Sequence, residues 1–174
     1  MKFFIDLLIK LCEKLGRVQH VYGRTKAEIY MCRYILFRSE IFTIYLHQFL
    51  RSDQDSYHDH PWNFWTYVVS GAYCEHKPYD QKKPLVKDTI FNRTVTQNRL
   101  VHRKAEELHW VEIDRTYSYD ERFSAPTTIC FIGRRKRVWG FIDKSNGNWV
   151  FWKQYLGLPF TQDELLKSRP SSEG

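Results

Sequence analysis

The stretch HDHPWNFWTYVVSGAYCE (residues 58–75) carries the pattern that decides the fold. His58 and His60 stand two residues apart, so in an extended strand both side chains point to the same face. Pro61 pushes His60, the residue before it, toward the extended region. The aromatic and β-branched run that follows is typical of a strand, and we expect one over residues 64–73.

Similar short runs occur on both sides of this stretch. We expect further strands at residues 29–37, 41–50, 86–95, 99–103, 107–113, 127–133, 137–142 and 148–152. Residues 143–147 have the composition of a hairpin loop, and residues 76–85 hold prolines and charges that indicate a turn. Many short strands with no helix between them predict an all-β antiparallel sandwich or barrel.

The two ends of the chain differ from this middle part. Apolar residues recur at helical spacing on one face of residues 2–16, which predicts an amphipathic N-terminal helix closed by Gly16. We expect a single domain in which the helix and its loop (residues 1–27) pack on a barrel (residues 28–160). The tail, residues 161–174, is expected to be partly disordered.

The composition limits the classes of function. With 174 residues, of which 43% are hydrophobic, the chain is long enough for one folded domain. Its net charge of +7 favours anionic partners. The four cysteines have no paired spacing, which argues against a zinc ribbon or a disulfide scaffold and for thiols in a reducing compartment. No run approaches the ~20 apolar residues of a membrane span, so we expect a cytoplasmic protein without a membrane partner.

Arg134, Arg135, Lys136 and Arg137 form the one dense basic run. We interpret it as a solvated turn between two strands. A nucleic-acid contact is the weaker alternative.

His109 lies in EELHWVEI (residues 106–113), a strand candidate placed to face His58 and His60 across a barrel. Neutral imidazoles suit iron, zinc, nickel or copper, and carboxylates would be added for manganese. The sequence therefore predicts a metal site made by these three histidines. His102 is an alternative third ligand.

These residues resemble the two-part signature of the cupin superfamily, in which one strand supplies His-x-His and a later strand supplies one more histidine. More narrowly, the chain resembles uncharacterised bacterial and phage cupin-like proteins with an HDHPW motif. The resemblance covers about residues 28–155 and rests on LH (46–47), HDHPWNF (58–64), GAYCE (71–75), His109, RVWGF (137–141) and WVFWKQY (149–155). It implies a jelly-roll β-barrel of the RmlC-like type and a bound metal, but no settled reaction.

One departure from the cupin pattern bears on the ligands. Metal-binding cupins place a glutamate a few residues after the second histidine, and residues 61–67 contain no carboxylate. The site should therefore be three-histidine, as in thiol dioxygenases, or be completed from elsewhere, with Glu75 as the nearest carboxylate along the strand. Three neutral ligands leave the metal its full charge and open positions for water, dioxygen or a chelating anion.

Several further residues are candidates for catalysis or substrate binding. Tyr73 could transfer a proton through its phenol, and Glu75 through its carboxylate. The aromatic Tyr45 and Trp65 are candidates for substrate contact.

Two arginines and one histidine could support the site from its surroundings. Arg99 and Arg103 are candidate anion clamps, because guanidinium groups bind carboxylate and phosphate in a bidentate manner. His47, on the strand before the motif, could orient a metal ligand through its ring nitrogen. Asp59 alternates to the face opposite His58 and is interpreted as structural.

Two classes of function fit this sequence. The first is a metal-dependent oxygenase or isomerase, with iron(II) as the first expectation and zinc, manganese or nickel as alternatives, acting on a small anionic substrate. The second is a module that binds a nucleotide or sugar without catalysis. The missing glutamate favours the second, so the sequence leaves open whether the chain is an enzyme. Cupin-like barrels often pair through strands, which suggests a homodimer.

Overall fold

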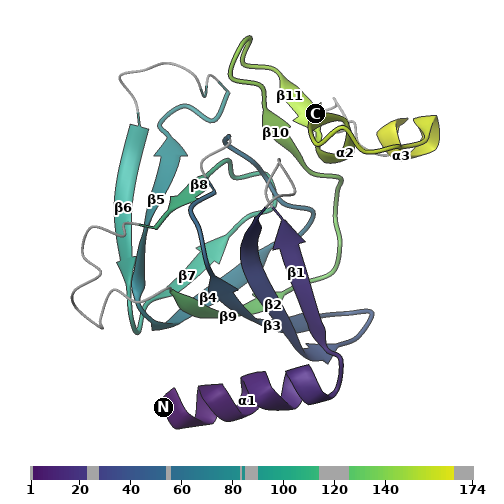
Figure 1. Ribbon diagram of the computed structural model, residues 1–174. Coiled ribbons are helices and arrows are strands. Elements are labelled where there is room, and N and C mark those ends of the chain that lie inside the picture. Colours follow the sequence, from purple (N-terminus) through teal and green to yellow (C-terminus); the bar gives the residue numbers. More distant parts are fainter. Residues whose placement is uncertain are drawn as a thin grey trace.

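Two antiparallel β-sheets face each other in the computed structural model of the chain (Figure 1). The structure describes residues 2–22, 28–53, 56–82, 84, 90–113 and 126–166. The larger sheet has six strands in the order β1 (Val18–Tyr22), β2 (Ile29–Arg38), β3 (Thr43–Phe49), β9 (Thr127–Ile132), β4 (Phe64–Ser70) and β7 (Leu100–Arg103). The smaller sheet has the order β6 (Ile90–Thr96), β5 (Ala72–Pro78) and β8 (Trp110–Glu112).

Short elements at the two ends of the chain complete the fold. Helix α1 (Lys2–Lys14) precedes the strands, and β10 (Gly140–Ile142) pairs with β11 (Trp149–Phe151) in a hairpin. Helices α2 (Trp152–Tyr155) and α3 (Gln162–Leu166) follow, on the side of the molecule away from α1 (Figure 1). The predicted all-β, single-domain jelly-roll class with an N-terminal helix is confirmed. The described strands form separate sheets rather than one closed barrel.

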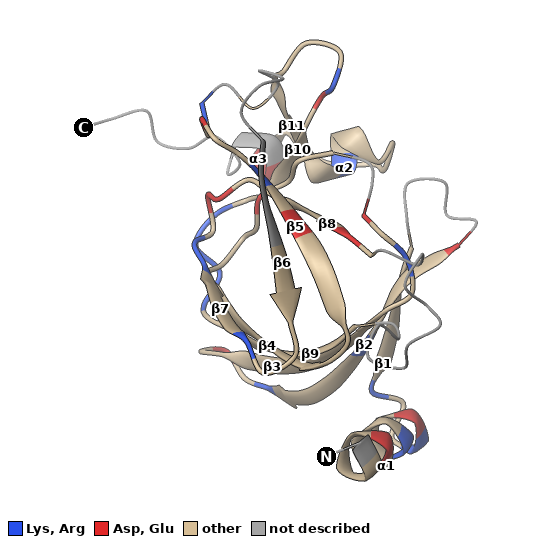
Figure 2. Ribbon diagram, turned by 90° about the vertical axis from the view of Figure 1, so that its left-hand side faces the viewer, with Lys and Arg blue, Asp and Glu red and all other residues tan. Residues whose placement is uncertain are grey.

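Helix α1 lies against the outer face of the larger sheet (Figure 2). Its Ile5 and Cys12 are buried in one cluster with Leu46 of β3 and Val69 of β4. Neighbouring side chains of a strand point to opposite faces, so Tyr45 of β3 points toward the smaller sheet. The helix therefore fixes which face of the larger sheet becomes the interior.

A second apolar cluster joins the two sheets from the inside. Its members are Val68, Tyr73, Val95, Val101 and Val111, which come from β4, β5, β6, β7 and β8. This cluster holds the smaller sheet over the larger one, and the polar side chains of the interior lie beside it.

Three local features differ from the expectation. The strand expected over residues 64–73 ends at Ser70, because Gly71 adopts a φ of 74° and turns the chain into β5 of the other sheet. Strand β1 lies in the expected loop, where pairing with β2 satisfies its backbone. The last strand ends at Phe151, one residue before the expected end at Trp152, where the helical turn Trp152–Tyr155 begins.

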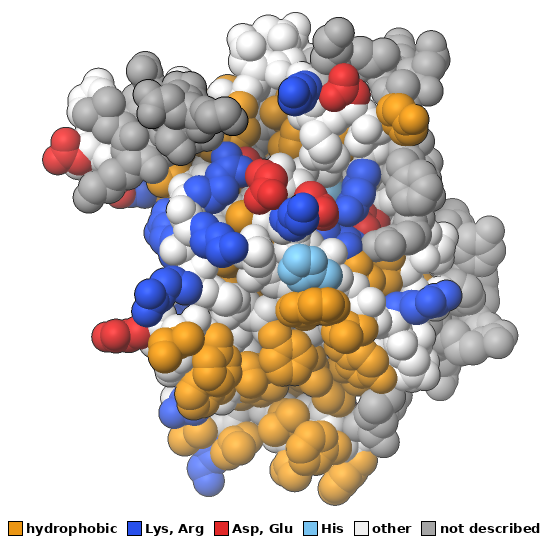
Figure 3. All heavy atoms as spheres, turned by 180° about the vertical axis from the view of Figure 1, so that it is seen from behind, with side chains coloured by type: hydrophobic (Ala, Val, Ile, Leu, Met, Phe, Trp, Pro, Cys, Tyr) orange, Lys and Arg blue, Asp and Glu red, His pale blue; other side chains and the backbone are white. Residues whose placement is uncertain are grey.

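The outer face of the larger sheet and α1 together expose apolar side chains (Figure 3). Phe4, Leu7, Trp65, Leu100 and Phe131 are between 43% and 60% exposed. The suggested homodimer stays a prediction. Among the described helices, none has the length and apolar character needed to cross a membrane.

Gly140 is the tightest backbone position of the β10–β11 hairpin. A Cβ atom there would lie 2.2 Å from the carbonyl oxygen of Val150 and 2.6 Å from Cε2 of Trp149. We expect Gly140→Ala to lower the free energy of unfolding by about 2 kcal/mol or more, because the partner strand must move. Urea unfolding of the variant measures this loss.

Gly133→Ala is the matched control. Its nearest neighbour, the carbonyl oxygen of Asn63, is an ordinary 3.4 Å from the added Cβ, so the cost should be below about 1 kcal/mol. Equal effects of the two substitutions would contradict the close packing of the hairpin.

Candidate metal centre

The three predicted ligands lie on segments that are held together by their backbones. The amide of His58 donates to the carbonyl of His109 at 3.0 Å, and the amide of His109 donates to the carbonyl of His58 at 3.1 Å. His58 also bridges to Phe141 of β10, and the amide of His60 donates to the carbonyl of Ala105 at 2.8 Å. These bonds keep both histidine segments extended, although the neighbouring strand β8 begins only after His109.

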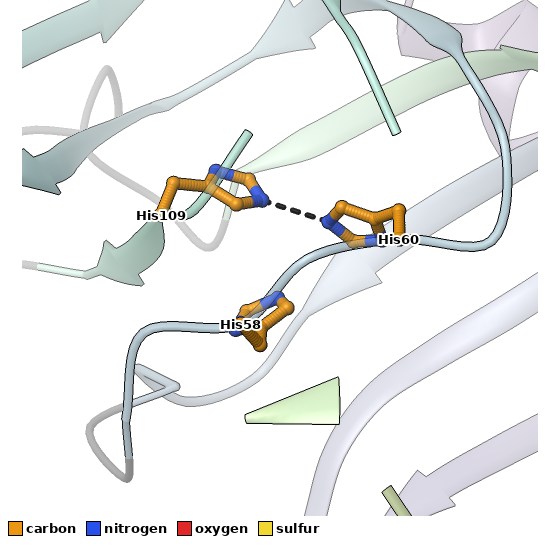
Figure 4. Close-up of side chains that lie close together, drawn as sticks. All are labelled: His58, His60 and His109. Carbon is orange, nitrogen blue, oxygen red and sulfur yellow. Dashed lines mark hydrogen bonds between the residues drawn. The ribbon is translucent and has the colours of Figure 1, made fainter. Parts of the chain in front are cut away.

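The three imidazole rings converge (Figure 4). Ring centroids are 5.1 Å apart for His58 and His60, 5.0 Å for His58 and His109, and 5.1 Å for His60 and His109. Nε2 of His60 lies 2.8 Å from Nε2 of His109, and one nitrogen of each ring lies within 4.8 Å of the others. The structure thus brings together the three histidines that the sequence singled out.

Burial keeps the rings of His58 and His60 neutral. Burial and the neighbouring His109 lower the pKa of His58 to about 3. Burial, His109 and His58 together lower the pKa of His60 well below its ordinary value. Neutral imidazole is the form that binds metal ions. Two ring nitrogens 2.8 Å apart can share either one proton or one cation.

Two carboxylates face the opposite nitrogens of these rings. Nδ1 of His109 lies 2.8 Å from the carboxylate of Glu75. Nδ1 of His58 lies 3.5 Å from the carboxylate of Asp53 and 3.4 Å from the carbonyl of Ser56. An acceptor at Nδ1 holds the ring proton there and leaves Nε2 for a metal. No sequence pattern points to Asp53, because this residue stands in a polar loop with no periodic relation to His58.

Glu75 is the buried anion of the site, and Arg103 is its partner. Nε and Nη2 of Arg103 both donate to the carboxylate, and the two side chains are only 5% and 1% exposed. Burial alone would raise the pKa of Glu75, but the hydrogen bond with His109 and the charge of Arg103 hold it at about 2. Arg103, a candidate substrate clamp in the sequence, is therefore engaged by Glu75.

Two other predicted residues, Tyr73 and Arg99, come from β5 and from the turn between β6 and β7. Tyr73 shares the inner face of β5 with Glu75, and its ring packs in the apolar cluster that joins the sheets. Arg99 is exposed in the turn between β6 and β7, directly after Asn98 with its φ of 65°. The catalytic role of Tyr73 and the anion-binding role of Arg99 stay predictions.

Trp65 and His102 lie on the outer face of the larger sheet. They are paired across β4 and β7, with ring centroids 4.6 Å apart. The next pair, Phe64 and Arg103, points inward. Alternation along the strands therefore puts His102 on the face opposite His109, and it is not the third ligand. Trp65, a candidate for substrate contact, lies on that opposite face as well.

Tyr45 and His47 lie on the inner face of β3, where both contact Arg33 of β2. Nε of Arg33 donates to Nε2 of His47 at 3.2 Å, and the guanidinium lies 4.8 Å from the centre of the Tyr45 ring. Nδ1 of His47 lies 3.3 Å from Sγ of Cys130. Burial and the charge of Arg33 lower the pKa of His47 well below its ordinary value. Its ring nitrogens are thus directed at Arg33 and Cys130 rather than at a ligand histidine.

Asp59 points away from the two histidines that flank it and is only 2% exposed. Its carboxylate accepts from the amide of Gly140 at 2.7 Å, Nε1 of Trp149 at 2.9 Å and Nη1 of Arg137 at 2.8 Å. Burial raises its pKa to about 6, against the opposing charge of Arg137. Asp59 thereby ties the histidine segment to the β10–β11 hairpin. The rest of the basic run, residues 134–136, is exposed.

A second group of metal-ligating residues lies on the other face of the smaller sheet. Cys74 and His76 alternate with Glu75 along β5, and Glu112 of β8 lies beside them. Nε2 of His76 is 2.7 Å from the Glu112 carboxylate, and its ring stacks on Trp110 with centroids 3.7 Å apart. His76 is thus already held by a carboxylate and a stacked ring. In the three-histidine group, by contrast, Nε2 of His60 faces Nε2 of His109.

The sequence matches no model of a known protein family and no curated protein. Solved structures with a similar chain trace include KdgF from Halomonas sp., at 14% identity and a TM-score of 0.44, over 63% of this chain and 85% of that chain. The polyketide cyclase RemF from Streptomyces resistomycificus shows 11% identity and a TM-score of 0.47, over 71% and 77%. Hydroxypropylphosphonic acid epoxidase from S. wedmorenis shows 10% identity and a TM-score of 0.44, over 68% of this chain and 56% of that chain, little more than half its length.

Glu75→Gln tests the buried ion pair. The substitution leaves Arg103 buried without its anion, so we expect the free energy of unfolding at pH 7 to fall by about 3–5 kcal/mol. Glu107→Gln is the control, because Glu107 pairs with Lys77 at 3.0 Å and both are partly exposed. Its effect in urea unfolding should be below about 1 kcal/mol.

The same variant has a predicted pH dependence. The folded pKa of Glu75, about 2, lies below the ordinary value of 4.5. The stabilisation by this charge is therefore complete above pH 4.5 and is lost as the pH falls toward 2. The difference between wild type and Glu75→Gln should shrink over that range. A difference that does not change with pH would contradict the ion-pair account.

Proposed function

We propose that the chain is a cupin-type protein in which His58, His60 and His109 hold a divalent transition metal for chemistry on a small anionic substrate. The observation that supports this most strongly is the convergence of three imidazoles from two separate segments, of which His58 and His60 are kept neutral by a lowered pKa. The resemblance of the HDHPW motif to cupin-like proteins supports the same assignment.

The donor set fits iron(II), zinc or nickel better than manganese. Among the described residues, the group of converging ligands contains three histidines and no carboxylate. A neutral donor set leaves the ion its full charge and leaves positions for other ligands. Both features favour an anion as the molecule that binds next to the metal, in agreement with the net charge of +7.

The chain's own residues orient the ligands and keep water out. Glu75 fixes the ring of His109 through Nδ1, and we assign it this orienting role in place of direct catalysis. Phe64 packs 4.7 Å from His60 and Phe141 packs 5.5 Å from His58, as ring centroids, which forms an apolar wall beside the ligands. When bound, iron(II) would supply redox chemistry with dioxygen, and an oxygenase-type reaction is the enzyme function we propose.

A binding function is the second candidate, and one observation favours it. Glu75 and Tyr73, the two residues predicted from the sequence to transfer a proton, both have other contacts. Glu75 is engaged by Arg103 and His109, and the ring of Tyr73 packs in an apolar cluster. In that case the interior would hold a small anion without converting it.

Metal content tests the assignment of the ligands. We expect the wild type to bind about one equivalent of zinc or iron(II) and to melt at a higher temperature with the metal than without it. The double variant His58→Ala, His60→Ala should lose both effects and still fold.

Two single variants serve as controls. His102→Ala changes an exposed histidine on the outer face, and His76→Ala changes the second group of metal-ligating residues. Both should keep the metal. Loss of the metal in His76→Ala, with retention in the double variant, would move the site to Cys74, His76 and Glu112 and contradict the proposal.

Oxygen consumption separates the two functions. The iron(II)-loaded protein is mixed with a panel of small carboxylic acids in an oxygen electrode, and mass spectrometry identifies any ligand released from the denatured protein. Substrate-dependent uptake that is absent from the double variant supports the oxygenase. A recovered ligand that is unchanged, with no uptake, supports binding alone.

A further inference from the structure

Arg33 is a cation of the interior whose described partners are neutral. Its strand neighbours Cys32 and Tyr34 pack in the cluster under α1, so Arg33 points to the opposite, inner face of β2. There it contacts His47 and the ring of Tyr45. None of the described carboxylates forms an ion pair with it. Arg103, by contrast, is neutralised by Glu75.

The rest of the guanidinium is available to a ligand. Nε is used by His47, whereas Nη1 and Nη2 donate to no described residue. Arg33 also keeps some accessible surface, so a small molecule can reach it. A buried cation is costly unless an anion accompanies it. The two remaining NH₂ groups form a fork that matches the two oxygens of a carboxylate.

Arg33 and the three histidines share one interior. Tyr45, which lies under the guanidinium, belongs to the cluster that contains Phe64, and the Phe64 ring packs 4.7 Å from the ring of His60. A molecule bound at Arg33 therefore extends toward the metal ligands.

We infer that Arg33 binds the carboxylate of a small organic acid whose other end reaches the centre formed by His58, His60 and His109. The inference deepens the proposed function and rests on it. A carboxylate fits better than a phosphate, because the neighbouring cation Arg38 is exposed and already donates to the hydroxyl of Tyr45 at 2.9 Å. The guanidinium of Arg33 is then left to balance one negative charge, whereas a phosphate dianion brings two. His47 and Tyr45 position the guanidinium, and Cys130 holds His47 from behind.

Acetate is the probe for the test, and inorganic phosphate is the comparison. Metal-free and zinc-loaded protein are titrated calorimetrically at constant ionic strength. We expect saturable binding of acetate that Arg33→Gln weakens about tenfold or more, with unchanged zinc content. Arg135→Gln, which changes an exposed arginine of the basic run, should bind acetate as the wild type does.

A second variant separates ligand binding from a structural role. Arg33→Met should bind no acetate and should melt at the wild-type temperature or above, because it removes a cation without an anionic partner. Equal acetate binding by wild type and Arg33→Gln, tighter binding of phosphate than of acetate, or a lower melting temperature of Arg33→Met would overturn the inference. Loss of zinc binding with intact Arg33-dependent acetate binding would overturn the metal proposal alone.

Discussion

The site depends on the pair of backbone hydrogen bonds between His58 and His109. These bonds, at 3.0 and 3.1 Å, join two extended segments that lie outside the named strands. Because an extended chain alternates, the same contact that directs His58 and His60 inward directs Asp59 outward to Gly140 and Trp149. The segment of residues 58–60 is thus held on both of its faces. The ligand rings therefore already lie close together without further rearrangement.

The two arginines of the interior, Arg103 and Arg33, differ in whether an anion neutralises them. Glu75 cancels the charge of Arg103 and orients His109, so this pair supplies position but no net charge. Arg33 and a metal ion would both be positive, and His58 and His60 are neutral. An interior of this kind attracts an anion and disfavours a cation. The apolar rings beside the histidines strengthen that preference, because charges interact more strongly away from water.

Short-range patterns in the sequence predict most of the strands and the pair His58 and His60, whereas His109 enters through its strand candidate and the resemblance to cupins. Alternation places His58 and His60 on one face, and the run after Pro61 is strand-like by composition. Prediction from sequence fails where two contacting side chains come from strands that are distant in the chain. The pairing of Glu75 with Arg103 and the contact of Arg33 with His47 depend on strand order and register, which no local pattern encodes. Gly71 was expected inside a strand, because sequence does not show that the next residues join another sheet.

X-ray absorption at the zinc edge of the zinc-loaded protein tests the central claim most directly. Zinc held by His58, His60 and His109 should show imidazole nitrogen neighbours at about 2.0–2.1 Å and no sulfur neighbour. The spectrum should lose its imidazole contribution in the double variant His58→Ala, His60→Ala. A sulfur neighbour at about 2.3 Å would place the metal at Cys74 or another cysteine and contradict the account.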